Sequence, residues 1–352
     1  MFDEIPKIRF FPRSINICDN KTFLYGPPQS GKTTLALWHA GKFQHVLYMD
    51  CNMLFSKHLL ELAKNKLNDK SSQLELLIID NITLDFSVYF NDIVVKCPCI
   101  YIGQIEACPN GFSPLLVLPL SFEEYIGIDK KNLNIENLLS IFIKDGNSPE
   151  MLILADYKKR EYKWRSMQFY LKDDMPIFIN ILSFQSLKTS IYGIYTHLKQ
   201  HIKISKDRIY PLIHSLQKNN ILHVCHHVDT NATKTKKFKL YYYDFALAAD
   251  FADSKHFIRT YENMVFLELI SMGFTLKYSN YCDLIDSSKN IIFICMPFAG
   301  IESILKRIQL IRKKEKQYNT YTIYVITMSS NYEFSKNEMA IDFASIALYL
   351  RS

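Results

Sequence analysis

The sequence predicts an α/β protein that begins with a parallel β-sheet and ends with a second, smaller α/β domain. In the first part of the chain, four short apolar runs alternate with helix-favouring stretches, which is typical of a parallel sheet buried on both faces. These runs are 23–25, 46–50, 74–80 and 99–103. From about residue 184 the pattern changes to two helices and a hairpin, and after about residue 250 strands and helices alternate again.

These changes of pattern divide the chain into four parts. Helical spacing of apolar residues over 184–198 and a capping residue at Ser205 predict two consecutive helices, and 221–243 predicts a hairpin. Helices followed by a hairpin are the outline of a winged helix. Pro211 either lies in the first turn of a second helix that starts late, or kinks that helix. The expected parts are a core at 1–130, a helical connection or lid at 131–183, a winged helix at 184–250 and an α/β domain at 251–352.

The composition excludes several classes of protein. Hydrophobic residues make up 48% of the chain and charged residues 22%, so an intrinsically disordered chain is excluded. No apolar run reaches the roughly 18–20 residues that a bilayer requires, and the first residues do not resemble a secretory signal. The 8 cysteines are scattered, as reduced thiols would be. We therefore expect a soluble, cytoplasmic protein with no membrane partner.

The strongest motif lies between the first strand and the first helix. Residues 26–33 read Gly-Pro-Pro-Gln-Ser-Gly-Lys-Thr and match G-x-x-x-x-G-K-[ST] in full. Such a loop wraps a phosphate with its backbone N–H groups, while Lys32 reaches the β- and γ-phosphates and the Thr33 hydroxyl binds Mg²⁺. An ordinary strand–helix turn is the less favoured interpretation. The expected nucleotide-binding residues are Gly26, Pro27, Pro28, Gln29, Ser30, Gly31, Lys32, Thr33 and Thr34.

A carboxylate at the end of another apolar strand is the expected partner of this loop. Leu76 to Asp80 reads LLIID, so Asp80 would hold Mg²⁺ together with Thr33, as Walker B acids do. The next residue is Asn81, whose amide orients a water but cannot accept its proton. The sequence therefore predicts ATP or ADP and Mg²⁺ as ligands, with Lys32, Asp80 and Asn81 as catalytic candidates. It supports binding better than turnover.

Basic residues concentrate in the predicted winged helix. The chain has a formal net charge of +7, but 185–240 alone holds ten Lys or Arg against two Asp, a net charge of +8. A block of this size suits a phosphate-binding surface, although a solvated basic face is equally frequent. The expected contacts to nonspecific DNA are Lys203, Lys206, Arg208, Lys234, Lys236, Lys237 and Lys239. A protein partner in place of DNA stays an alternative, and the sequence leaves the oligomeric state open.

Together these segments resemble a prokaryotic family of AAA-type P-loop ATPases that carry a winged helix and then a degenerate PD-(D/E)xK nuclease-like domain. The matching segments are GPPQSGKTT (26–34), LYMD (47–50), LLIID (76–80), IYIGQIE (100–106), LPLSFEEY (118–125), KFKLYYYDFAL (237–247) and YENMVFLELISMGF (261–274). The resemblance implies the fold class α/β, with a P-loop NTPase sheet of AAA type, then the winged helix, then a small nuclease-like domain. It also implies ATP binding.

The chain departs from this family at three places that bear on hydrolysis. Family members carry Asp-Glu where this chain has Asp80-Asn81. Their sensor strand ends in a Thr-Gly-Ser-like turn, which here reads Gly103-Gln104, and the arginine that follows is missing from 107–112. We therefore expect weak or partner-dependent hydrolysis.

The last domain is expected to have a nuclease-like fold without nuclease chemistry. Glu262, Glu268 and Asp283 supply carboxylates, but the strand where Glu-x-Lys belongs, 291–297, has no charged residue. A single acid does not anchor the metal that such nucleases use. The expected elements are a helix at 254–271, strands at 274–279, 281–286 and 290–296, a basic helix at 305–316 and a strand at 321–328.

Three weaker signals have ordinary explanations. His223, Cys225 and the two histidines after it suggest zinc, but alternation along a strand favours solvated hairpin residues. Cys97 and Cys99 fit a buried strand better than a redox pair, which usually has C-x-x-C spacing. The basic-aromatic patch at 157–165 suits an exposed helix better than a base-stacking surface.

Overall fold

The structure is a computed structural model that describes residues 13–53, 61, 65, 74–83, 97–128, 133–229, 237–252 and 256–349 of the 352-residue chain. It divides into two units. The first comprises Met1–Pro119 with Lys218–Asn220, and the second comprises Leu120–Gln217 with Ile221–Ser352. Among the helices of the described ranges, none combines the length and apolar character that a bilayer crossing requires.

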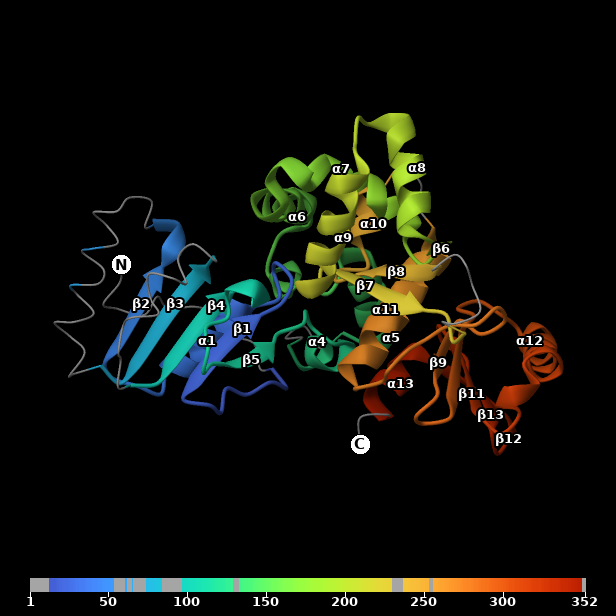
Figure 1. Ribbon diagram of the computed structural model, residues 1–352. Helices are drawn as coiled ribbons and strands as arrows, with labels where there is room; N and C mark the ends of the chain where they lie inside the picture. The colour runs from blue at the N-terminus through green and yellow to red at the C-terminus, as the bar shows by residue number, and fades with distance from the viewer. Residues whose placement is uncertain are drawn as a thin grey trace. The chain divides into compact units, whose positions relative to one another are not determined.

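The first unit is built on a five-stranded, fully parallel sheet, as the sequence predicted. The strand order is β2-β3-β4-β1-β5 (Figure 1). The strands are β1 (Lys21–Tyr25), β2 (Val46–Asp50), β3 (Leu76–Ile82), β4 (Cys99–Gly103) and β5 (Ser113–Leu116), with short 3₁₀ turns at Cys51–Met53 and Ile105–Ala107. Helix α1 (Lys32–Ala40) follows β1 directly. All four predicted apolar runs are strands.

Neighbouring residues of a strand point to opposite faces of the sheet, and an apolar cluster buries each face. Phe23, Met49 and Ile79 belong to one apolar cluster. Tyr48 and Ile78 belong to the other, together with the buried face of α1. Since Tyr48 and Ile78 lie two residues before Asp50 and Asp80, both carboxylates lie on the α1 face, at the carboxyl edge of the sheet.

The second unit starts with helices. They are α4 (Phe122–Ile128), α5 (Ile135–Asp145), α6 (Asp156–Leu171) and α7 (Met175–Ile181), with 3₁₀ turns at Pro149–Leu152, Lys172–Asp174 and Leu182–Phe184. The segment predicted as a helical connection at 131–183 is thus mainly helical, with short non-helical links at 133–134, 146–148 and 153–155. Its charged helix α6 buries Lys163 and Met167. The interpretation of 157–165 as an exposed helix is therefore wrong for Lys163.

Two helices and a small antiparallel sheet follow, as predicted. The elements are β6 (Lys188–Thr189), α8 (Ile191–His201), α9 (Lys206–Lys218), β7 (Leu222–His226), β8 (Phe238–Tyr242) and α10 (Leu247–Phe251). The strand order is β6-β8-β7. Ile209, Ile213 and Leu216 of α9 are buried in the same apolar cluster as residues of β7 and β8. Helix α9 starts at Lys206 and has Pro211 in its interior, which excludes the alternative of a late start and leaves that of a kink.

The last part of the second unit contains a mixed sheet with the strand order β12-β13-β11-β10-β9. Its elements are α11 (Phe257–Ser271), β9 (Leu284–Asp286), β10 (Ile291–Cys295), α12 (Ile301–Lys314), a 3₁₀ turn at Lys316–Tyr318, β11 (Thr322–Thr327), β12 (Tyr332–Ser335), β13 (Glu338–Asp342) and α13 (Phe343–Tyr349). The strand predicted at 274–279 is wrong: only single bridges form, at Lys277 and Tyr278. Strands β12 and β13 were missed.

Candidate functional site

The loop between β1 and α1 has a backbone that only certain residues adopt. Gly26 has φ +139°, and a Cβ at this position would lie 2.4 Å from the carbonyl oxygen of Val117. Gly31 has φ +85° and precedes the first residue of α1. Even Gln29 has positive φ, at 60°. The two glycines of the motif therefore meet a steric requirement of the loop.

The ammonium of Lys32 lies within this loop. Its Nζ donates to the carbonyl oxygens of Gly26 at 3.1 Å and of Pro27 at 2.6 Å. Nζ is also 3.4 Å from the hydroxyl oxygen of Ser30, a fully buried residue. Thr33 and Thr34 follow in the first turn of α1, where backbone N–H groups have no partner inside the helix. The loop thus collects a cation and helix N–H donors, which is the chemistry of an anion site.

Thr33 and Asp80 are brought together from distant parts of the sequence. The Thr33 hydroxyl donates to Asp80 Oδ2 at 2.7 Å, and the Tyr48 hydroxyl donates to the same oxygen at 3.0 Å. The backbone N–H of Asn81 donates to Oδ1 at 2.7 Å. Burial raises the pKa of Asp80, against the lowering effect of these hydrogen bonds. Hydroxyl and carboxylate oxygens side by side are donors of the kind that Mg²⁺ prefers, so these residues fit that ion.

Asn81 points toward a second carboxylate. It has φ +58°, a left-handed conformation that Asn tolerates better than most residues. Its Nδ2 donates to Asp50 Oδ1 at 2.9 Å, and the backbone N–H of Asn52 donates to the same oxygen at 2.9 Å. Asp50 and Asp80 are direct partners in the parallel pairing of β2 and β3. The carboxyl edge therefore carries two acids. Asp50 ends the segment LYMD but was not predicted as a site residue.

A further residue that the sequence analysis missed holds the loop from outside. Arg13 donates through Nη1 to the carbonyl oxygen of Ser30 at 2.9 Å and through Nη2 to that of Leu118 at 2.7 Å. Both contacts lie within the first unit. The guanidinium is a rigid fork, so it fixes the two carbonyl groups relative to each other. No motif in the sequence marks this position.

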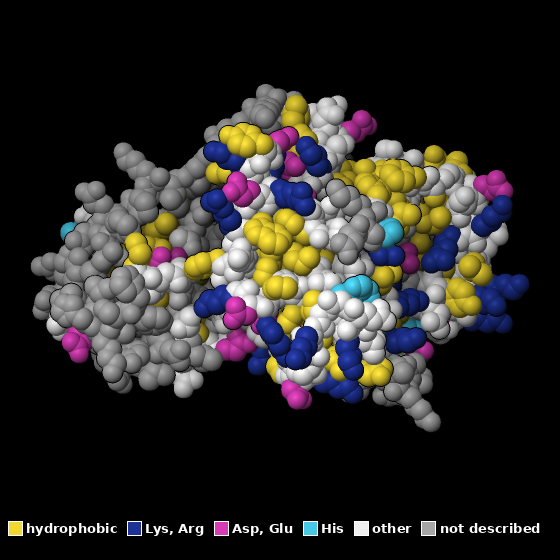
Figure 2. Space-filling model, turned by 90° about the horizontal axis from the view of Figure 1, so that it is seen from above, with side chains coloured by type: hydrophobic (Ala, Val, Ile, Leu, Met, Phe, Trp, Pro, Cys, Tyr) yellow, Lys and Arg dark blue, Asp and Glu magenta, His cyan; other side chains and the backbone are white. Residues whose placement is uncertain are grey.

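The predicted DNA-contacting residues divide into three groups. Lys203, Lys206 and Arg208 are exposed, as is Lys237. Lys234 and Lys236 lie outside the described residues. Lys239 is 5% exposed, and its Nζ lies 2.8 Å from Glu262 Oε1. A buried, paired ammonium does not reach a phosphate, so the prediction for Lys239 is wrong. Figure 2 shows basic side chains interspersed with apolar and acidic ones.

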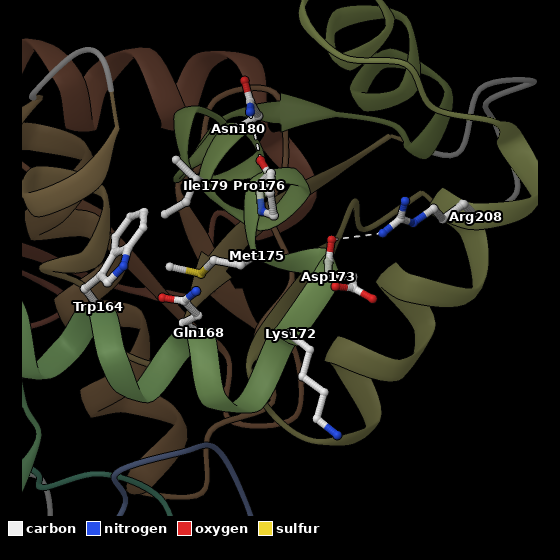
Figure 3. Close-up of a pocket in the computed structure, with 9 residues that line it drawn as sticks. All are labelled: Trp164, Gln168, Lys172, Asp173, Met175, Pro176, Ile179, Asn180 and Arg208. Atoms are coloured by element: carbon white, nitrogen blue, oxygen red, sulfur yellow. Dashed lines mark hydrogen bonds between the residues drawn. The ribbon is translucent and has the colours of Figure 1, made fainter.

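Arg208 lies at one end of a cavity of about 840 Å³ in the second unit (Figure 3). Trp164 from α6 and Ile179 from α7 line its other end. The guanidinium of Arg208 donates to Asp174 Oδ1 at 2.7 Å and to the carbonyl oxygen of Asp173 at 3.0 Å. Its charge is therefore partly neutralised, which weakens it as a phosphate contact compared with Lys203 and Lys206.

The carboxylates predicted for the last domain are engaged by other groups of the chain. Glu262 accepts from Lys239 and from the Tyr241 hydroxyl, the latter at 2.6 Å. Asp283 accepts from the backbone N–H of Cys295 at 3.0 Å and has Arg307 at 3.6 Å. Glu268 is buried and accepts from the backbone N–H of Phe122. Among the described residues, no group of three His, Cys, Asp or Glu could hold a metal ion.

The histidine-rich strand β7 is only partly solvated. His223 is half-buried and its Nε2 is fully buried, so the interpretation of this residue as solvated is wrong, and burial lowers its pKa to about 4. His226 is exposed, and Cys225 is buried. Cys99 is also buried, and its thiol donates to the carbonyl oxygen of Cys97. Both cysteines of that pair are free thiols.

Comparison with known proteins adds little to this geometry. No protein-family model matches the sequence, and no curated protein matches it. Among solved structures, the chain is similar to the Walker-type ATPase of Pyrococcus abyssi, with 14% sequence identity and a TM-score of 0.47. The match covers 66% of this chain and 91% of that one.

Proposed function

We propose that the chain binds ATP or ADP with Mg²⁺ at the loop 26–33 and acts as an AAA-type, nucleotide-dependent switch associated with DNA. The observation that carries this proposal is the 2.7 Å contact between the Thr33 hydroxyl and Asp80 Oδ2, beside a loop that holds the Lys32 ammonium. Elements 188–251 would be a winged helix and 257–349 a nuclease-like domain without nuclease chemistry. Their element order supports these assignments.

In this proposal each group of the loop has a defined task. The backbone N–H groups of 26–33 bind the phosphates, and Lys32 exchanges the carbonyl oxygens of Gly26 and Pro27 for phosphate oxygens. Thr33 and Asp80 hold Mg²⁺, which neutralises charge on the β- and γ-phosphate oxygens when bound. Arg13 keeps the carbonyl of Ser30 turned outward from the phosphates. The chain's own residues thereby bind and orient the nucleotide.

Replacing Lys32 by alanine is expected to weaken ATP binding roughly 10- to 150-fold, since a charged hydrogen bond contributes about 1.5–3 kcal/mol. Titration of a fluorescent ATP analogue in the presence of Mg²⁺ measures the change. The matched control is Lys21→Ala, which removes an exposed lysine at the start of β1. Equal affinity of the Lys32→Ala variant and the unsubstituted chain would contradict the proposed site.

The proposed association with DNA rests on the basic residues of 185–240, of which Lys203, Lys206 and Lys237 are exposed. A variant with Lys234, Lys236 and Lys237 all changed to Glu is expected to lose most of its retention on heparin and its binding to a nonspecific duplex. For the unsubstituted chain, log Kobs should fall with log salt at a slope of about 0.9 per phosphate contact, because each contact releases counterions. Binding that is independent of salt would exclude DNA.

A protein partner is the second candidate function. The cavity beside α6 and α7 favours it, because Trp164, which lines the cavity, is 41% exposed. If the triple Glu variant keeps the duplex affinity of the unsubstituted chain, the switch would act through such a partner. In both cases the nucleotide site is the same.

A further inference from the structure

We propose that Asp50 is the catalytic base for ATP hydrolysis in this chain. It would replace the glutamate that related ATPases carry at the position of Asn81, and this inference rests on the proposed nucleotide site. The need for such a group follows from chemistry. The water that attacks the γ-phosphate has to be oriented and has to lose a proton, and the amide of Asn81 accepts none. A carboxylate near Asp80 would supply the proton acceptor that the amide of Asn81 cannot provide.

The register of the sheet places Asp50 where that carboxylate is needed. Asp50 and Asp80 are direct partners on neighbouring parallel strands, so their side chains leave the same face at the same edge. Tyr48, two residues earlier on β2, already reaches Asp80 Oδ2 with its hydroxyl at 3.0 Å. Asp50 lies two residues after Tyr48, at the carboxyl end of β2, and points to the same face of the sheet, the face against which α1 packs. Thr33 approaches Asp80 from that helix.

The hydrogen bonds to Asp50 favour this role because both use one oxygen. Asn81 Nδ2 and the backbone N–H of Asn52 donate to Oδ1, each at 2.9 Å. Two donors on Oδ1 fix the plane of the carboxylate and leave Oδ2 as the oxygen for a water. Asn81 therefore acts as a positioning residue, and its left-handed backbone conformation directs its amide to β2.

The proposed step is an ordinary hydrolysis. The water oxygen forms a bond to the γ-phosphorus, and the bond from that phosphorus to the bridging oxygen breaks, its electron pair leaving with ADP. One water proton passes to Asp50 Oδ2. The products are ADP and inorganic phosphate, and the carboxyl group returns its proton to bulk water. General-base catalysis of this kind contributes about 10²- to 10⁴-fold in rate.

The test is steady-state ATP turnover and ATP affinity of the Asp50→Asn variant. Asparagine keeps an oxygen for both hydrogen bonds and removes only the proton acceptor. We expect kcat to fall by about 100-fold or more while the Kd for the ATP analogue stays within about threefold. The matched control is Glu106→Gln, since Glu106 lies two residues past Gln104 in the turn after β4 and is another acid of the first unit. A kcat of Asp50→Asn within threefold of the unsubstituted chain would overturn the proposal.

A second variant separates a base from a structural role. In Asp50→Asn/Asn81→Glu the carboxylate returns on the neighbouring strand, and turnover should recover at least tenfold over Asp50→Asn. Because residue 81 has φ +58°, the single variant Asn81→Glu is the control for backbone strain. If that control turns over ATP as fast as the unsubstituted chain while the double variant shows no recovery, the assignment is overturned. If the unsubstituted chain binds ATP but turns it over no faster than Lys32→Ala, the assignment of Asp50 as the base is wrong and the proposed ATP site still stands. If it does not bind ATP, the proposed function itself fails.

Discussion

Replacing Lys163 by methionine is expected to lower the free energy of unfolding of the second unit by about 3–5 kcal/mol, because it leaves buried carboxylates without their partner. Lys163 Nζ lies 2.8 Å from Asp250 Oδ2 and 3.5 Å from Asp244 Oδ2. The side chains of Lys163 and Asp244 are each 1% exposed. Burial lowers the pKa of Lys163, but the two carboxylates outweigh it, so the net pKa is raised and the ammonium stays charged.

The loss of stability in the Lys163→Met variant should depend on pH in a defined direction. Burial raises the pKa of Asp244 above its usual value even beside Lys163, and removal of the lysine would raise it further. A raised carboxyl pKa stabilises the fold below the unfolded pKa, and this contribution disappears as pH rises through the folded pKa. The deficit of Lys163→Met should therefore be larger at pH 8 than at pH 5.

Urea denaturation of the two proteins at both pH values measures this difference. The variant Lys163→Met/Asp244→Asn should regain most of the stability, since it removes both charges of the buried pair. Lys158→Met, at an exposed position of the same helix, should stay within about 0.5 kcal/mol of the unsubstituted chain. A deficit that is equal at pH 5 and pH 8 would argue against an uncompensated carboxylate.

Replacing Lys239 by methionine is expected to destabilise the second unit by a similar amount, about 3 kcal/mol. Lys239 joins β8 to α11 through Glu262 and donates to the carbonyl oxygen of Asp283 at 3.4 Å. Burial raises the pKa of Glu262, and loss of the ammonium would raise it further, so this deficit should also grow with pH. Thermal and urea unfolding measure it.

The matched variant for this pair is Lys239→Met/Glu262→Gln. The Tyr241 hydroxyl can still donate to the amide oxygen of Gln, so the double variant should recover most of the stability. A double variant as unstable as Lys239→Met would show that the lysine stabilises the fold by its aliphatic contacts instead. The same pair explains why a basic residue in the hairpin was mistaken for a phosphate contact.

Features that depend on contiguous residues could be predicted from the sequence. The loop 26–33 is a complete motif in one stretch, and the apolar runs that form β1 to β4 are nearly continuous. Asp80 was found because it ends such a run. The segments 332–335 and 338–342 mix charged and apolar residues and lack this signal, and β12 and β13 were missed for that reason. The segment 274–279 alternates apolar and polar residues as a half-buried strand does, but it forms only isolated bridges.

Features that depend on register or on distant contacts could not be predicted. The pairing of Asp50 with Asp80 follows from how β2 and β3 align, which no local pattern specifies. Lys163 and Lys239 have the sequence surroundings of surface lysines. The acids that pair with them, Asp250 and Glu262, come 87 and 23 residues later in the chain. Net charge counted along the sequence therefore overstates the basic surface of this region.

The contact of Arg13 with Ser30 and Leu118 bears on how this protein can be dissected. A chain shortened past residue 13 would keep the whole motif 26–33 and every strand of the first sheet. It would nevertheless lose the fork that fixes the carbonyl of Ser30 against that of Leu118. The minimal fragment that preserves the proposed nucleotide site therefore has to start before the first strand, at a residue that no motif search would include.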